Sequence, residues 1–170
     1  MTFPASFGTA RLVAHRLDAS HYDDLRRLQT DAGYMAELGG VRTEEQTRAY
    51  LATNLDHWAQ HGFGLWMLTG KDSAEPIGLA ILRHVDVAGA DEVETGYGFL
   101  PEFWGRGLAT EICTACLGFG FGTLDLRSIV AVTPPRHHKS QHVLLKLGFA
   151  YERDVDLRGA RLSLFRIHRP

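Results

Sequence analysis

The sequence predicts an α/β domain of the α+β type, with a mixed, mostly antiparallel sheet of six to seven strands flanked by about four helices. Two observations carry this prediction. Strand-like and helical patterns follow in the order strand, two helices, three strands, helix, strand, helix and two strands. The three successive strands have no helix between them, whereas a doubly wound sheet alternates strand and helix throughout.

The N-terminal part of the chain is expected to form one strand and two helices. Residues 9–17 alternate apolar and polar side chains enough for a strand. Residues 33–41 are rich in glycine and are expected to be irregular. Each helix is expected to begin at a capping box, in which two side chains three residues apart bond backbone N–H groups. The two boxes are Ser20 with Asp23, and Thr43 with Gln46, and the second helix extends to about His61.

The remaining elements follow from apolar runs and glycine turns. Apolar segments at 63–69 and 77–85 flank turn-forming residues, which is typical of a hairpin, and a third strand is expected at 92–100. A third helix begins near Gly105 and is expected to end at the glycine run 118–122, read as a helix terminator and turn. A strand, a helix closed by Gly148 and an antiparallel pair are then expected at 128–133, 140–147, 151–157 and 161–168.

The turn before the third helix is the strongest functional signal. It contains the hexapeptide Gly105-Arg106-Gly107-Leu108-Ala109-Thr110. Glycines let the backbone approach a ligand closely, and the helix that follows directs unpaired N–H groups and the positive end of its dipole to the same place. The hexapeptide therefore predicts a site for the pyrophosphate of a phosphorylated cofactor.

The hexapeptide alone leaves other interpretations open. A Rossmann site would have an acidic residue about 20 positions on, where Asp125 lies, but its third glycine is missing near Thr110. A P-loop would need a lysine after Gly107, where Leu108 stands. An ordinary glycine turn before a helix accounts for the hexapeptide equally well.

Three blocks of sequence narrow these alternatives. The first is Thr9-Ala10-Arg11-Leu12-Val13-Ala14-His15-Arg16-Leu17, the second is ETGYGFLPEFWGRGLATE from Glu94 to Glu111, and the third is SQHVLLKLGF from Ser140 to Phe149. In this order they resemble the GCN5-related N-acetyltransferases (GNAT superfamily), and within it the RimJ/RimL type that acetylates ribosomal-protein N-termini. The resemblance covers most of the chain and implies the GNAT fold, in which the sheet splays apart between its fourth and fifth strands.

The resemblance implies an acetyl-CoA-dependent N-acetyltransferase. The acetyl group would pass directly to a primary amine, a protein N-terminus or a small-molecule amine, through a tetrahedral intermediate. Backbone groups of Phe99 and Leu100 would pair with pantetheine in the splayed gap, and the loop from Gly105 to Thr110 would hold the pyrophosphate, with Arg106 adding charge. The run from Arg136 to Lys139 would meet the adenosine end or be solvated surface, with His137 where the family usually has asparagine.

Catalysis would need a base, an oxyanion donor and a donor to the leaving thiolate. Glu94 is the first candidate for the base, directly or through water, and Glu92 shares its strand face. His84 is a weaker candidate. The oxyanion donor is expected to be a backbone N–H near Gly98 or Phe99.

The thiolate donor departs from the common family pattern. Many GNAT enzymes place a tyrosine four residues after the small residue on the last helix. Here that small residue is Ser140 and the later position is Leu144, so Ser140 itself is the expected donor. His142 is expected to face elsewhere.

Charge and length exclude several other classes. The chain has 170 residues and a formal net charge of −2, which indicates one domain over 1–170 with no general affinity for nucleic acid or anionic membranes. No apolar run approaches the roughly 20 residues of a membrane span, and no signal peptide is evident. A cytoplasmic monomer or homodimer is therefore expected.

No metal is expected. Cys113 and Cys116 have the spacing of a redox pair or half a zinc site, but they fall inside the third helix among apolar residues, where cysteine packs as a small hydrophobe. His57 and His61 lie one helical turn apart without the glutamate of a metalloprotease helix, so a solvated helix face is expected.

The acceptor is not defined by the sequence. Residues 30–42 are expected to shape its pocket, and Asp31, Glu37 and Glu92 would attract a cationic amine. Two alternatives to an enzyme remain: a GNAT module that binds acyl-CoA without turnover, and a nucleotide-binding protein that uses the same glycine loop.

Overall fold

The computed structural model describes residues 4–170 and confirms the predicted fold class. In this part of the chain one sheet holds eight strands in the order β1-β2-β3-β4-β5-β6-β8-β7. All neighbouring strands are antiparallel except β5 and β6. The count exceeds the expected six to seven because the short strand β1 (Ser6–Gly8) folds back onto β2 (Leu12–Arg16) at the edge of the sheet.

The N-terminal helices differ from expectation at their starts. The first capping residue is Asp18, not Ser20: its carboxylate accepts from Ser20 N, and the His21 ring accepts from Asp18 N. This box opens a 3-10 turn, η1 (Ala19–His21), that leads into α1 (Tyr22–Thr30). The segment expected to be irregular contains the short helix α2 (Ala32–Met35). The box of Thr43 with Gln46 is confirmed at the start of α3 (Glu44–His61).

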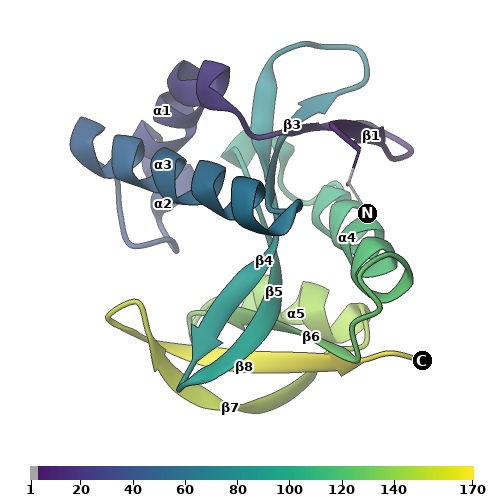
Figure 1. Ribbon diagram of the computed structural model, residues 1–170. Coiled ribbons are helices and arrows are strands. Elements are labelled where there is room, and N and C mark those ends of the chain that lie inside the picture. Colours follow the sequence, from purple (N-terminus) through teal and green to yellow (C-terminus); the bar gives the residue numbers. More distant parts are fainter. Residues whose placement is uncertain (1–3) are drawn as a thin grey trace.

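Three long strands form the centre of the sheet. The expected hairpin is present as β3 (Leu65–Gly70) and β4 (Pro76–Val87), and β4 continues into β5 (Ala90–Phe99) through a tight turn. The register pairs Arg83 with Glu94, and Leu79 with Gly98. Figure 1 shows β4 and β5 running together through the middle of the molecule.

The third predicted helix is longer than expected. α4 (Leu108–Gly122) includes the glycine run 118–122, at which the sequence predicts that the helix ends. A Cβ at Gly120 would lie 2.4 Å from Cδ1 of Ile129, so the glycine lets α4 pack directly on the sheet. This close packing overrides the low helix propensity of glycine.

The C-terminal elements are close to their predicted bounds. β6 (Ser128–Thr133) is followed by α5 (His138–Lys146), and Gly148 has the positive φ, 93°, of a helix-ending glycine. β7 (Ala150–Leu157) and β8 (Ala160–His168) form the expected antiparallel pair.

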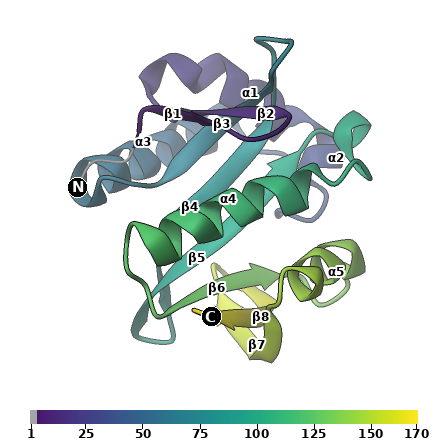
Figure 2. The same ribbon diagram turned by 90° about the vertical axis from the view of Figure 1, so that its right-hand side faces the viewer.

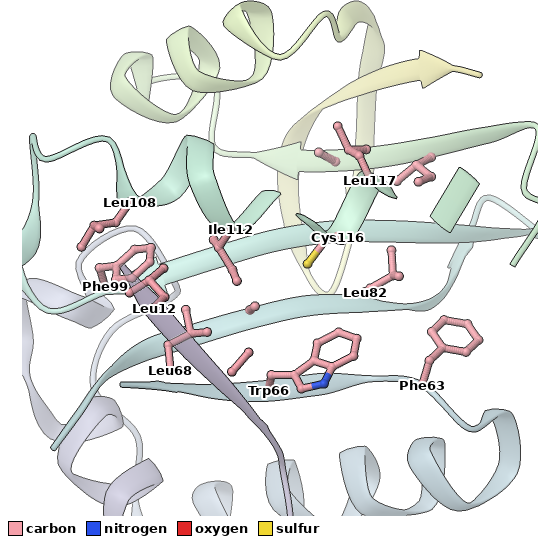
Figure 3. Close-up of a cluster of buried hydrophobic side chains, with 14 of the residues drawn as sticks. Leu12, Phe63, Trp66, Leu68, Leu82, Phe99, Leu108, Ile112, Cys116 and Leu117 are labelled. Carbon is pink, nitrogen blue, oxygen red and sulfur yellow. The ribbon is translucent and has the colours of Figure 1, made fainter. Parts of the chain in front are cut away.

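Helices cover both faces of the sheet. Figures 1 and 2 show α4 on one face and α1, α2 and α3 on the other. The core under α4 joins Leu12, Trp66, Leu82 and Ile112 (Figure 3). Cys116 belongs to the same core, as expected from its apolar surroundings, and burial raises the pKa of its thiol to about 12.

The sheet separates where the splay was expected. β5 and β6 are the fourth and fifth of the predicted strands, and among the described residues they share a single register pair, Glu94 with Val130. Beyond this pair the two strands diverge, so the end of β5 from Tyr97 to Phe99 has a strand neighbour on one side alone, which is β4.

Candidate active site

A cavity of about 1310 Å³ opens where β5 ends. α3, β4, β5, the segment that follows β6, and the hairpin of β7 and β8 all contribute to its walls. In Figure 1 the loop between β7 and β8 projects on the side of the molecule occupied by α2 and α3. Residues distant in sequence therefore meet here, among them Tyr50, Arg83, Tyr97, Gly98 and Arg158.

The glycine loop has the geometry of an anion site. Gly105 and Gly107 have left-handed backbones, with φ of 71° and 76°, and Gly107 is the N-cap of α4 without a side-chain cap. The first bond of the helix runs from Glu111 N to Gly107 O, at 3.1 Å. The N–H groups of residues 108–110 therefore have no acceptor within the helix, and a pyrophosphate fits this arrangement.

Arg11, which directly precedes β2, and Glu111 of α4 hold this loop in place. Arg11 Nη1 donates to Arg106 O at 2.7 Å, and its Nε donates to Glu111 Oε2 at 2.7 Å. Thr9 Oγ1 donates to the other carboxylate oxygen at 2.6 Å. Burial raises the pKa of Glu111, but these hydrogen bonds outweigh it and lower the pKa overall. Sequence reasoning did not assign Arg11 to the loop, although it stands in the first resembling block.

The backbone at the end of β5 is partly engaged within the chain. Leu100 N donates to Ile77 O, and Leu100 O accepts from Phe103 N, both at 2.9 Å. The expected pairing of Leu100 with pantetheine is therefore not supported. Because backbone groups alternate between the two sides of a strand, Tyr97 and Phe99 direct their N–H groups into the gap beside β6.

A hydroxyl pair stands beside this gap. Tyr97 lies on β5, and its hydroxyl donates to Ser140 Oγ on α5 at 3.3 Å. Burial raises the pKa of Tyr97 to about 12, so the phenol keeps its proton near neutral pH. Sequence reasoning identified Ser140 and the missing tyrosine of the last helix, but it did not find that β5 supplies a tyrosine hydroxyl to the same serine.

Two glycines allow close contacts at the end of β5, one of them with another tyrosine. A Cβ at Gly98 would lie 2.6 Å from the hydroxyl oxygen of Tyr34, and a Cβ at Gly78 would lie 2.1 Å from Gly98 O. Burial raises the pKa of the Tyr34 hydroxyl. The absence of a side chain at Gly98 thus provides space for the Tyr34 ring.

Glu94 is buried between two arginines. Its Oε1 accepts from Arg83 Nε at 2.8 Å and also from Arg158 Nη2, and its residue is 4% exposed. Arg83 Nη1 donates in turn to Asn54 Oδ1 at 2.9 Å. Glu94 does not line the cavity, whereas both arginines do. This carboxylate holds guanidinium groups, and the geometry does not support the expected role as the base.

The other acidic candidates are also engaged. Glu92 forms a two-point ion pair with Arg166, at 2.8 and 3.0 Å. Asp31 caps α2 by accepting from Tyr34 N, and Glu37 pairs with Arg136 at 3.2 Å. All three carboxylates thus have partners within the chain, and the expectation that Asp31, Glu37 and Glu92 attract a cationic acceptor stays a prediction.

The histidines of α3 are not simply solvated. The rings of His57, His61 and His84 lie close together, with centroids 4.4–5.8 Å apart. His57 bonds Phe63 O through Nδ1 and accepts from His84 N through Nε2. Burial lowers the pKa of His57 to about 4. Among the described residues no cluster of histidine, cysteine and carboxylate side chains could hold a metal ion.

The basic run from Arg136 to Lys139, at the start of α5, has side chains in two separate surroundings. Arg136 lines the cavity and pairs with Glu37, while Lys139 Nζ lies 5.6 Å from the centre of the Trp104 ring. His137 is half-buried at the N-cap of α5, and burial lowers its pKa. The run is therefore not one cationic cluster.

Comparison with known families identifies the class of protein. The model of the acetyltransferase (GNAT) domain matches residues 11–150. The chain belongs to the GNAT acetyltransferase family, whose members transfer acetyl groups from acetyl-CoA. Within residues 4–170, no helix is long and apolar enough to cross a membrane.

Other proteins are similar to this chain in sequence or in fold. YkkB, an uncharacterized protein of Bacillus subtilis (strain 168), is 27% identical over 128 residues, which are 75% of this chain and 74% of YkkB. An acetyltransferase of Agrobacterium tumefaciens str. C58 superposes with a TM-score of 0.85 at 22% identity, over 99% of this chain and 96% of its own. RimL, a ribosomal alpha-N-protein acetyltransferase solved in complex with coenzyme A, superposes with a TM-score of 0.75 at 18% identity, over 99% and 98%.

Proposed function

We propose that this protein is an acetyl-CoA-dependent N-acetyltransferase that acts on a primary amine, either a protein N-terminus or a small molecule. One observation carries the proposal. The uncapped start of α4 and the gap between β5 and β6 lie at the end of one strand, and that strand end also lines the cavity. A bound thioester and an amine in the cavity would thus meet at Tyr97–Phe99.

The cofactor is held mainly by backbone groups. The N–H groups of residues 108–110, and the left-handed turns at Gly105 and Gly107, bind the pyrophosphate. The N–H of Phe99 pairs with pantetheine in the gap. Arg106, His137 and Lys139 surround the adenosine end, with His137 as a neutral hydrogen-bonding group. Family membership and the coenzyme A bound to RimL support this assignment.

The reaction is direct acyl transfer. The thioester supplies the acetyl group, and the amine attacks it through a tetrahedral intermediate. The backbone N–H of Tyr97 also points into the gap and stabilises the oxyanion. Ser140 donates its proton to the departing thiolate and receives one from Tyr97, and Tyr97 regains its proton from water, which takes up the proton that the amine loses.

The proton of the amine follows another route. An amine with a pKa of about 8–10 must lose a proton before it attacks. Glu94 is held by Arg83 and Arg158 and does not line the cavity. We therefore assign Glu94 to positioning these arginines, and water in the open cavity accepts the proton.

Thermal melting tests the cofactor first. The protein is melted with acetyl-CoA, CoA, NAD or ATP, and a ligand at about 100 times its dissociation constant should stabilise the fold by about 2.7 kcal/mol. A shift with the CoA species alone supports the proposal, and acetyl transfer to a panel of amines completes the test. A shift with NAD or ATP alone would overturn it, and binding of acetyl-CoA without transfer to any amine would indicate a non-catalytic acyl-CoA module.

A further inference from the structure

We propose that the acceptor carries a carboxylate set well apart from its reacting amine, and that Arg42, Arg83 and Arg158 bind this carboxylate. The proposal rests on the proposed function and deepens it by naming the substrate class. It commits to an acidic amine, as in a peptide whose N-terminus is followed within a few residues by an acidic side chain.

The charge of the cavity differs from that of the chain. The formal net charge of the protein is −2, yet arginines outnumber carboxylates among the described residues of the cavity wall. The arginines are Arg42, Arg83, Arg136, Arg158 and Arg161, and the acids are Glu37 and Asp86. Carboxylates just outside the wall pair with several of these arginines, so the attraction for an anionic ligand depends on which arginines stay uncompensated.

Two of these arginines have carboxylate partners of their own. Arg136 pairs with Glu37 at 3.2 Å. Arg161 pairs with Asp156 at 3.4 Å and with Asp154 at 3.8 Å. Their charges are largely balanced by these neighbours, so they are not assigned to the ligand.

Arg83 and Arg158 share one carboxylate. Both donate to Oε1 of Glu94, so two positive groups face one negative group. The Arg83 side chain is 13% exposed, and the Arg158 side chain reaches Glu94 from the β7–β8 turn. Arg158 has a φ of 54°, a left-handed conformation that favours asparagine or glycine in such a turn.

Arg42 is the third member of the site. Its guanidinium stacks on Tyr50, with Cζ 4.3 Å from the ring centre, and Arg83 lies 5.9 Å from the same centre. In residues 4–170 Arg42 has no carboxylate within ion-pair distance, although its backbone is held by Gln29 O and by Arg26. Arg42 and Arg83 thus both lie beside Tyr50 in the cavity wall, and a carboxylate that reaches them would form charge-assisted hydrogen bonds.

The position of the arginines sets the length of the acceptor. Arg83 stands opposite Glu94 in the sheet, and Gly98 lies four residues further along β5. At the rise of a strand this separation is about 13 Å. Arginine side chains shorten the distance, but a free α-amino acid, whose amine and carboxylate are adjacent, cannot span it. An extended peptide advances about 3.3 Å per residue, so an acidic side chain near its third residue can reach the arginines while the N-terminal amine lies at Gly98.

Matched acceptors test the inference. The probes are a tripeptide amide with alanine at the first two positions and glutamate at the third, its glutamine counterpart, free alanine and spermidine, each with acetyl-CoA. We expect kcat/KM for the glutamate peptide to exceed that for the glutamine peptide by roughly tenfold or more, because a carboxylate forms charge-assisted bonds with guanidinium groups. The difference should shrink at high salt. A preference for free alanine over both peptides would overturn the extended geometry.

Arginine variants locate the effect. Arg42→Gln should raise KM for the glutamate peptide by roughly tenfold while leaving the glutamine peptide and acetyl-CoA almost unaffected. Arg48→Gln is the matched control, because Arg48 also stacks on a tyrosine, Tyr22, at 4.5 Å, but it pairs with Glu44 outside the cavity wall. Arg48→Gln should change neither KM.

The two proposals fail in different ways. The enzyme proposal stands if acetyl-CoA stabilises the protein and amines are acetylated. The carboxylate site is nevertheless wrong if kcat/KM for the glutamine peptide or for spermidine equals that for the glutamate peptide. An unchanged peptide preference in Arg42→Gln would also overturn the site. If no amine is acetylated and no CoA species shifts the melting temperature, the proposed function itself is wrong.

Discussion

The glycine loop and the acceptor cavity are built in opposite ways. The loop depends on backbone conformation in one short segment, where two left-handed glycines precede the start of α4. The cavity depends on long side chains that converge from α3, β4 and the β7–β8 turn. A site built from backbone groups can be predicted from a local sequence motif, whereas a site built from side chains can be located only when the fold is known. The glycine loop should therefore tolerate substitutions that keep its backbone conformation, whereas the cavity should not tolerate the loss of its long side chains.

A substitution at the meeting point of the two regions should have the largest effect. In Gly98→Ala the new Cβ would lie 2.6 Å from the buried Tyr34 hydroxyl. We expect a loss of about 2 kcal/mol in unfolding free energy from overpacking and a fall in kcat/KM of roughly a hundredfold. Gly96→Ala is the control, because its Cβ would meet Ile81 at an ordinary 3.5 Å. Equal activity in the two variants would show that the approach of Tyr34 to β5 is unimportant.

Removing the charge that organises the cavity should have the next largest effect. Glu94→Gln leaves Arg83 buried without a charged partner, and we expect a loss of about 3 kcal/mol in unfolding free energy. Where the protein remains folded, the preference for an acidic acceptor should weaken while the KM for acetyl-CoA stays constant. Urea unfolding and steady-state kinetics measure the two effects. If Glu94→Gln were fully stable but lost all kcat, Glu94 would be the base after all.

The hydroxyl pair belongs to both regions, and its loss should affect turnover alone. Tyr97→Phe and Ser140→Ala should each lower kcat by roughly tenfold to a hundredfold, because the leaving thiolate loses its proton source. The double variant should be little worse than Ser140→Ala, since the two hydroxyls act in series. Losses that multiply in the double variant would contradict the proposed relay.

Changing the loop itself should have a smaller effect. Gly107→Ala places a Cβ on a residue with φ of 76°, which costs about 1 kcal/mol, and the dissociation constant for CoA should rise by a few fold. The KM values of acceptors should not change. Gly118→Ala, also in the region of α4 but with open space around its Cβ, should stabilise the protein slightly. Weakened acceptor binding in Gly107→Ala would mean that the two regions are not independent.

The difference between the regions also explains what the sequence could predict. The order of elements, the box of Thr43 and the splay beside β5 follow from local periodicity, caps and the family resemblance. The end of α4 could not be predicted in this way, because it depends on the contact between Gly120 and Ile129, which lie on different elements. The motif made Ser140 a candidate donor, which stays a prediction, but it gave no sign of the hydrogen bond from Tyr97. The arginines around Glu94 come from separate elements and carry no shared local pattern.

The histidine cluster should have the smallest effect on activity near neutral pH, and it lies at the end of the cavity farthest along α3 from Arg42. Burial lowers the pKa of His57 from 6.5 to about 4, so the folded state favours the neutral ring. The stability that this provides is complete above about pH 6.5 and is lost as the pH falls towards 4, because the unfolded chain takes up the proton first. Urea midpoints measured across this range should decline, and His57→Gln should flatten part of the decline. His138→Gln, which changes an exposed ring on α5, should leave it intact. An unchanged slope in His57→Gln would place the pH dependence elsewhere, in carboxylates such as Glu111, whose lowered pKa acts in the same direction but at lower pH.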